Sequence, residues 1–151
     1  GTRIVGTVGR LQPVKDQASL IRAFRHVHAR LPDTALVIVG DGSLREELEL
    51  VAVAEGVAGS VRFLGDRGDV PRLLAMAGMG AVIVRNGLNG MLVPSGDPMA
   101  LGAAISELLE SPDSAASMGS AGRAWVQREG SFTTMSERYL RLYAGEAAEV
   151  A

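Results

Sequence analysis

Short apolar runs alternate with amphipathic stretches along the first half of the chain. The runs at 3–8, 35–39 and 61–65 have the length and β-branched content of strands. After the first run, apolar side chains recur at helical spacing, namely Leu20, Ile21, Phe24, Val27 and Leu31. Three strand-then-helix units with short links predict right-handed crossovers within one parallel sheet. We therefore expect an α/β, Rossmann-like domain with helices on both faces of the sheet.

Polar residues mark where the predicted helices begin. Asp16 precedes the first amphipathic stretch as an N-cap. Ser43 and Glu46 have the spacing of a capping box, which predicts a second helix from there to about Gly56. The Asp-Val-Pro sequence at 69–71 predicts the start of a third helix, with proline in its first turn.

The second half of the chain has a different pattern. Residues 86–94 read as a turn that feeds a short strand at 91–93, and Asp97 caps another helix. Two further helices are predicted at 115–129 and 132–143. The last of them carries Phe132, Met135, Tyr139, Leu140 and Tyr143 on one side. Trp125 and the aromatic residues of this set are expected to be packing residues and not a cofactor-binding motif.

Composition narrows the class of protein. The chain has 151 residues, which we interpret as one domain, 1–151, and its 47% hydrophobic content excludes disorder. No apolar run approaches the roughly 20 residues that a membrane span requires. A net charge of −2 provides no global field for nucleic acid, so an anion site would have to be local. Cysteine is absent, which excludes disulfides and fits a cytoplasmic location. A longer protein that contains this chain could also associate peripherally with a membrane.

The main candidate chemistry lies just after the first predicted strand. The segment at 9–16, Gly-Arg-Leu-Gln-Pro-Val-Lys-Asp, places the cations Arg10 and Lys15 on a βα turn. In open parallel sheets, ligands bind at the carboxyl ends of the strands, where helix N-termini direct free N–H groups. We expect a phosphorylated ligand at this turn. The alternative is that both cations are ordinary solvated loop charges.

Other sequence signals for chemistry are weak. Gly40 and Gly42 lack the third glycine of a dinucleotide fingerprint, because Arg45 occupies that position. His26 and His28 are two positions apart on one predicted helix, so they do not face each other, and we interpret them as structural. No sequence pattern indicates a metal site, and we expect neither metal nor cofactor.

Four motifs in order resemble the C-terminal, donor-binding domain of glycosyltransferase family 4, which has the GT-B fold. They span residues 4 to about 110, and their combination is specific although each alone is weak. The motifs are Val8 to Lys15, Val37 to Gly42 (Val-Ile-Val-Gly-Asp-Gly), Val61 to Gly65 (Val-Arg-Phe-Leu-Gly), and Asn89 to Pro94 with Gly96-Asp97-Pro98.

The resemblance implies a retaining transferase that takes a sugar from a nucleotide diphosphate donor. Arg10 and Lys15, beside Gly9, match the residues that hold the donor diphosphate in that family. The residues that resemble the nucleoside-lining segments are Gly40, Asp41, Gly42, Phe63 and Leu64. An acceptor such as a glycan or lipid-linked glycan would be bound through an N-terminal domain that this chain does not contain.

The chain departs from the family pattern at two places. Asp16 stands where relatives have glycine, and its carboxylate would repel phosphate unless it caps the following helix.

The second departure is a short interval, because only eleven residues separate Leu74 from Asn86. The family pattern has a further strand, helix and strand there, including an acidic pair that contacts the donor, and a single βαβ unit needs about 30 residues. We infer that an internal segment is missing from this sequence, with a natural deletion as the second explanation, and the catalytic residues stay unknown.

Two other functions remain open from the sequence. One is a nucleotide-sugar epimerase of the same fold, which would convert the donor without transferring its sugar. The other is a non-catalytic binding or scaffold domain that kept the fold and lost the ligand.

Overall fold

The computed structural model describes residues 1–69, 84–129 and 132–143. The third predicted helix, after Asp69, and the gap proposed between Leu74 and Asn86 therefore fall largely outside the described residues. The described elements, in chain order, are β1 (Arg3–Val8), the 3-10 turn η1 (Pro13–Lys15), α1 (Gln17–Arg30), β2 (Thr34–Val39), α2 (Arg45–Ala54), the 3-10 turn η2 (Ala58–Ser60), β3 (Val61–Phe63), α4 (Pro98–Glu110), α5 (Pro112–Glu129) and α6 (Phe132–Tyr143).

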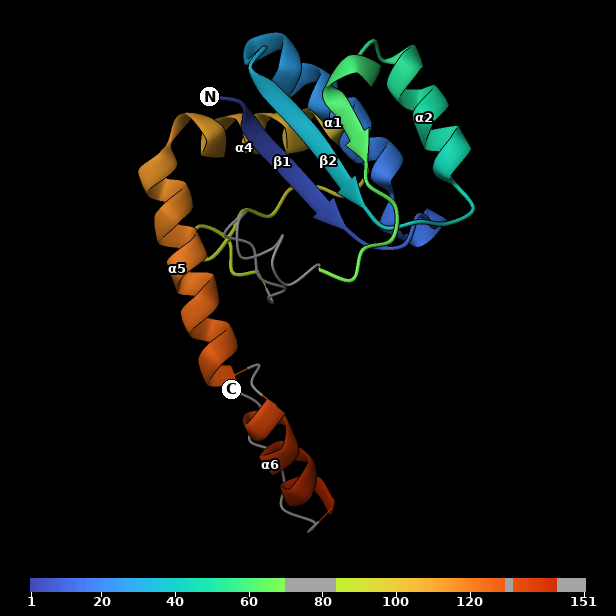
Figure 1. Ribbon diagram of the computed structural model, residues 1–151. Coiled ribbons are helices and arrows are strands. Elements are labelled where there is room, and N and C mark those ends of the chain that lie inside the picture. The colour runs from blue at the N-terminus through green and yellow to red at the C-terminus, as the bar shows by residue number, and fades with distance from the viewer. Residues whose placement is uncertain (70–83, 130–131, 144–151) are drawn as a thin grey trace.

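The three described strands form one parallel sheet in the order β1-β2-β3. Val5 of β1 lies beside Leu36 of β2, and Ile38 of β2 lies beside Phe63 of β3. The strand ends point in one direction, with α1 and α2 as the crossovers between them (Figure 1). The predicted parallel α/β fold is confirmed.

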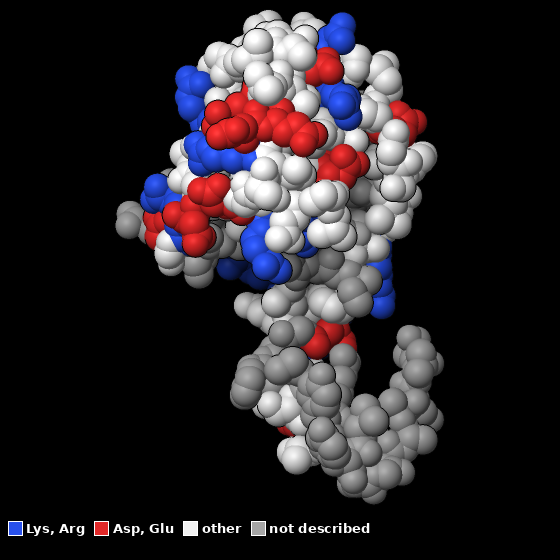
Figure 2. Space-filling model, turned by 90° about the vertical axis from the view of Figure 1, so that its right-hand side faces the viewer, with Lys and Arg blue, Asp and Glu red and all other residues white. Residues whose placement is uncertain are grey.

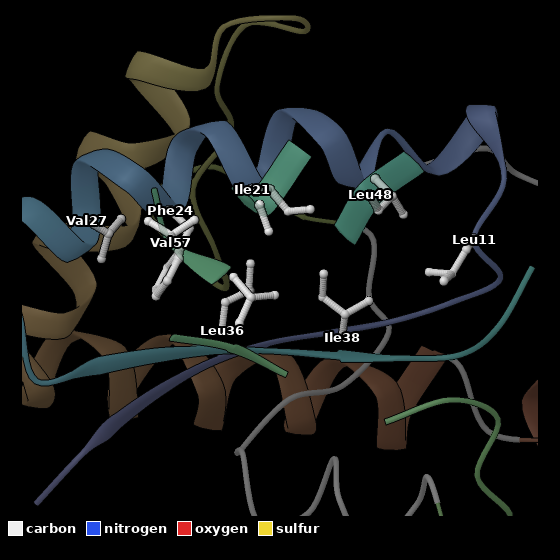
Figure 3. Close-up of a cluster of buried hydrophobic side chains, with 10 residues drawn as sticks. Leu11, Ile21, Phe24, Val27, Leu36, Ile38, Leu48 and Val57 are labelled. Atoms are coloured by element: carbon white, nitrogen blue, oxygen red, sulfur yellow. The ribbon is translucent and has the colours of Figure 1, made fainter. Parts of the chain in front are cut away.

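The core lies between the sheet and the helices α1 and α2. Figure 3 shows side chains of both helices and of β2 directed toward one another in this layer. The largest fully buried side chains are Phe24, Leu11, Ile21, Leu36, Ile38, Leu48 and Val27. Because burial of one such side chain contributes about 1.5–3 kcal/mol, this cluster is the main source of stability.

The opposite face of the sheet is less covered. Ile4 and Val8 of β1 lie on it and are 63% and 40% exposed. Of the described helices, α1 and α2 lie against the other face, and α4 packs mainly on α1. On the same face of the central strand β2, Val39 is 4% exposed and Val37 is half-buried, so in the described part the exposed apolar side chains of this face lie on β1.

The helix α4 docks closely against α1. Gly102 of α4 is buried, and a Cβ atom there would lie 2.9 Å from the backbone oxygen of Ala23. A glycine is thus required for this approach of the two helices. Arg30 of α1 also forms a bidentate ion pair with Glu110 of α4, at 2.7 Å for each bond. Asp97 caps α4 by accepting a hydrogen bond from the backbone N–H of Ala100, as predicted.

The helices α5 and α6 extend away from the sheet (Figure 1). Both were predicted, and α5 begins three residues earlier than expected. Trp125 on α5 is half-buried. Leu140 on α6 is 69% exposed. The side chains of Phe132, Met135, Tyr139 and Tyr143 lie outside the described part.

Two local predictions are wrong for identifiable reasons. The capping box at Ser43 does not form, because α2 begins only at Arg45 and its N-cap is Leu44, whose side chain cannot accept a hydrogen bond. No strand forms at 91–93. There the N–H of Leu92 donates to the side-chain oxygen of Asn86, instead of to a neighbouring strand.

Candidate functional site

Three loops follow the carboxyl ends of β1, β2 and β3 and are joined by backbone hydrogen bonds. We call these loops, residues 9–16, 40–44 and 64–69, the site edge. The N–H of Leu11 donates to the oxygen of Asp41 at 3.0 Å, which ties the first loop to the second. The N–H of Gly40 donates to the oxygen of Gly65 at 2.8 Å, which ties the second loop to the third. The three segments therefore lie along one edge of the sheet.

Two glycines allow this close approach. Gly40 has a φ of +128°, and a Cβ there would overlap the backbone oxygen of Gly9. At Gly42, a Cβ would collide with the backbone carbonyl of Leu11. A side chain at either position would push the first two loops apart, so the Gly-Asp-Gly turn is needed for the geometry of the edge.

Arg10 and Lys15 both lie on the first loop with exposed side chains. Neither forms an ion pair with another residue in the described part of the chain. The aliphatic stem of Lys15 covers Gly9, where a Cβ would lie 3.8 Å from its Cε atom. The two charges are therefore held on a short loop and remain available to an anion.

Asp16 stands between these cations and α1. It has a left-handed φ of 45°, which aspartate tolerates better than most residues, and its carboxylate accepts a hydrogen bond from the N–H of Ser19 at 3.3 Å. The carboxylate thus caps α1 as predicted. Its charge faces the positive end of a helix, which reduces the repulsion that an unengaged carboxylate would exert on phosphate.

The remaining candidate residues have local structural contacts. The Asp41 carboxylate accepts the N–H of Gly42 at 2.8 Å, which stabilises the turn. The Phe63 ring is half-buried beneath the guanidinium of Arg45, 5.6 Å from the ring centroid. Leu64 is 39% exposed, and its N–H continues the sheet by donating to the oxygen of Ile38.

The third loop carries a bidentate ion pair. The guanidinium of Arg67 donates to both carboxylate oxygens of Asp69 at 2.7 and 2.8 Å. This hydrogen bonding lowers the pKa of the exposed Asp69 carboxyl below its ordinary value. Asp69 is thus ionised and engaged by a cation near the site edge.

Two residues near the site were not singled out by the sequence. Gln17 is 4% exposed and donates a hydrogen bond to the backbone oxygen of Arg10. Arg45 lies over Phe63 and forms an ion pair with Glu49 at 2.9 Å. A signal existed for Gln17, because it occupies a position on the apolar stripe of α1 where a hydrophobic residue is expected.

The histidines lie away from the site edge. His28 stacks on Phe24 with ring centroids 5.6 Å apart, and its two ring nitrogens lie within hydrogen-bond distance of Thr34 and Ser60. These contacts agree with a structural role. In the residues that the structure describes, no group of three or more His, Cys, Asp or Glu side chains could hold a metal ion.

Charge is distributed without a single dominant sign. Figure 2 shows Lys and Arg side chains scattered among acidic ones on the face that it presents. None of the described helices is both long and apolar enough to cross a membrane. The two cations of the site edge are therefore a local feature on a chain of nearly balanced charge.

The fold is that of the C-terminal part of known glycosyltransferases. The structure is similar to Anabaena HepE in complex with UDP and glucose, with a TM-score of 0.84 and 23% identity over 95% of this chain and 48% of that one. It is also similar to an isolated C-terminal domain of a group 1 glycosyl transferase from Francisella tularensis, with a TM-score of 0.71 and 17% identity over 87% of both chains.

The chain belongs to the family "Glycosyl transferases group 1", whose model matches residues 1–82. It is 32% identical to a GDP-mannose-dependent alpha-(1-6)-phosphatidylinositol monomannoside mannosyltransferase of Mycolicibacterium smegmatis, over 94% of this chain and 48% of the relative. A Corynebacterium glutamicum relative, the GDP-mannose-dependent monoacylated alpha-(1-6)-phosphatidylinositol monomannoside mannosyltransferase, is also 32% identical, over 96% of this chain and 48% of its own length. The chain thus spans about half the length of these curated relatives.

Proposed function

We propose that this chain is the donor-binding part of a retaining GT-B glycosyltransferase of family 4. In this proposal, Arg10 and Lys15 bind the diphosphate of a nucleotide sugar, and the Gly40-Asp41-Gly42 turn and the Phe63-Leu64 segment line the nucleoside. The observation that carries the proposal is that two cations without an ion-pair partner among the described residues lie on one loop, and that backbone hydrogen bonds join this loop to the rest of the site edge. Family membership supports it.

GDP-mannose is the first donor to test. The two relatives at 32% identity are described as GDP-mannose-dependent enzymes that act on phosphatidylinositol mannosides. UDP is the second candidate, because a solved structure of the same fold holds it. The acceptor in this proposal is a glycan or a lipid-linked glycan, which agrees with the lipid-linked substrates named for the relatives.

Calorimetric titration of the folded chain with GDP, UDP and ADP tests the donor site. We expect Arg10→Ala and Lys15→Ala each to weaken nucleotide binding by about tenfold or more, since a charge-assisted hydrogen bond contributes about 1.5–3 kcal/mol. Arg123→Ala is the control, because Arg123 is an exposed cation on the distant α5. Absence of heat with every nucleotide would contradict the proposal and favour a scaffold domain.

The chain alone is expected to bind the donor without transferring its sugar. In the proposed two-domain enzyme, the acceptor hydroxyl is positioned by an N-terminal domain, and positioning can supply roughly 7–11 kcal/mol of the reduction in the barrier. A radiolabelled-donor assay with the 151-residue chain should show no transfer above background. Ordinary turnover by this chain would contradict the assignment of the site edge to half of an active site. Conversion of the donor sugar without an acceptor would indicate an epimerase.

We further propose that an internal segment is missing between Leu74 and Asn86. The alignment with the M. smegmatis relative spans 184 positions, 33 more than the 151 residues of the chain, so at least 33 positions are gaps in this sequence. The family match ends at residue 82, within the suspected interval. The exposed apolar side chains of Ile4 and Val8 on β1 also agree with the loss of covering structure.

Peptide mapping of the protein from its source cells tests this point. Trypsin cleaves after arginine, so a contiguous sequence would give one peptide that covers residues 73–85. We expect that peptide to be absent and to be replaced by peptides from the additional segment. Detection of the contiguous peptide in good yield would establish a natural deletion instead.

A further inference from the structure

Gln17 is a buried polar side chain on the apolar face of α1. Ile21 and Phe24 on the same face are fully buried in the core, and Gln17 itself is 4% exposed. Its amide nitrogen Nε2 donates a hydrogen bond of 3.0 Å to the backbone carbonyl oxygen of Arg10. The side chain therefore connects the first turn of α1 to the loop that carries the site cations.

The other end of the Gln17 amide differs from the nitrogen in its contacts. Within the described part of the chain, its oxygen Oε1 is buried and accepts no hydrogen bond. A buried acceptor without a donor destabilises the folded state, whereas a methionine of similar length would avoid that cost. An amide is thus unfavourable for packing alone, which indicates that its bond to Arg10 has another role.

The peptide unit between Arg10 and Leu11 is held from several directions. Its carbonyl oxygen accepts hydrogen bonds from the Gln17 side chain and from the N–H of Gln12, both at 3.0 Å. Its N–H donates to the oxygen of Asp41 at 3.0 Å. These hydrogen bonds fix the backbone from which the Arg10 side chain extends. The side chain itself is exposed, so its guanidinium can reach a ligand.

We propose that Gln17 is a positioning residue for Arg10. By holding the Arg10 carbonyl, it sets the direction in which the guanidinium leaves the loop toward the donor diphosphate, and so reduces the ordering required on binding. Gln17 acts through Arg10 and does not itself touch the nucleotide. This inference rests on the proposed function, because it requires a diphosphate bound at Arg10.

A double-mutant cycle tests the inference in the full 151-residue chain. GDP binding is measured by calorimetry for the unmodified chain, Gln17→Met, Arg10→Ala and the double variant, and thermal midpoints are recorded for all four. We expect Gln17→Met to weaken GDP binding by about threefold to tenfold, as for loss of one hydrogen bond, without lowering the midpoint. In the Arg10→Ala background, Gln17→Met should have no further effect on binding. Gln127→Met makes the same change on an exposed part of α5 and should leave binding unchanged.

Each other outcome counts against a specific statement. Equal weakening of binding in both backgrounds, or no weakening in either, would overturn the positioning role alone. Failure of the unmodified chain to bind GDP, UDP or ADP would overturn the proposed function and this inference together. If Gln17→Met does not fold, Gln17→Leu provides the same comparison, and a fall in midpoint with both variants would show that Gln17 is a packing residue.

Discussion

The sheet with α1 and α2 differs from the C-terminal helices α5 and α6 in how it is held together. The first region has ten buried side chains in one cluster and backbone hydrogen bonds between all three loops of its site edge. In the second, the described buried residue of α5 is Gly122, and Leu140 of α6 is largely exposed. The difference indicates that the candidate site rests on the part of the molecule with the greater share of buried apolar surface.

The largest expected effect separates the two regions directly. Phe24→Ala removes a fully buried ring and should lower the free energy of unfolding by about 3–5 kcal/mol. Leu140→Ala, on the exposed side of α6, should change it by less than about 0.5 kcal/mol. Chemical denaturation followed by circular dichroism measures both values. A similar loss from Leu140→Ala would show that α6 packs more extensively than the structure indicates.

Two glycines with positive φ provide a second contrast. Gly40→Ala places a Cβ on the Gly9 carbonyl, whereas Gly96, with a φ of +74°, has no atom within 4 Å of the corresponding position. Both substitutions incur a backbone cost of about 1–2 kcal/mol, and only Gly40→Ala adds a steric overlap. We expect Gly40→Ala to be the more destabilising and to reduce GDP binding, while Gly96→Ala leaves binding intact. Thermal denaturation and calorimetry of the two variants distinguish these effects, and equal effects would mean that the first two loops are not held as described.

An ion pair between α1 and α4 is expected to contribute less to stability than the buried ring or the Gly40 turn. Arg30 and Glu110 connect α1 to α4 with two bonds of 2.7 Å, but both side chains are partly exposed. Arg30→Ala should therefore cost at most about 1 kcal/mol, and the loss should shrink at high salt. Arg128→Ala, which removes an ion pair between adjacent residues on α5, should cost nothing measurable. A cost for Arg30→Ala that is unchanged at high salt would point to lost packing of its aliphatic stem instead of lost charge.

The smallest effect is a pH dependence at the amino-terminal end of the sheet. Hydrogen bonding from Arg3 lowers the pKa of the exposed Asp33 carboxyl from its ordinary value of 3.8. Because the folded-state pKa is the lower one, the contribution of Asp33 to stability is present above pH 3.8 and is lost as the pH falls below it. Asp33→Asn should make the free energy of unfolding less dependent on pH in that range. At pH 7 it should change that free energy only by a small amount that does not vary with pH. Urea denaturation between pH 2.5 and 7 tests this, and an unchanged acid slope would contradict it.

Features that depend on local spacing were predicted well from the sequence. The strand at 3–8, the helix after Asp16, the end of α2 near Gly56 and the Asp97 cap all occur where expected. The positions of Arg10 and Lys15 at the carboxyl end of β1 follow from the same reasoning. These features depend on side-chain periodicity and on short-range hydrogen bonds, which the order of residues specifies directly.

Tertiary contacts decided the rest. Leu44, and not Ser43, is the N-cap of α2, and the N–H of Leu44 bonds to Leu11, a residue on another loop. The strand at 91–93 lacks a ladder partner, and a strand exists only when another strand supplies hydrogen bonds to it. The role suggested for Gln17 depends on a carbonyl seven positions earlier that only the folded loop brings within reach.

The sequence by itself determined that Arg10 and Lys15 lie together on the turn after the first strand, and which segments follow the other two strands. The tertiary structure decided that those segments are joined through Leu11, Asp41, Gly40 and Gly65, and that Ile4 and Val8 of β1 stay exposed. The physical reason is that helix starts and apolar periodicity are properties of neighbouring residues, whereas hydrogen bonds between loops and burial of a sheet face depend on distant segments meeting in space.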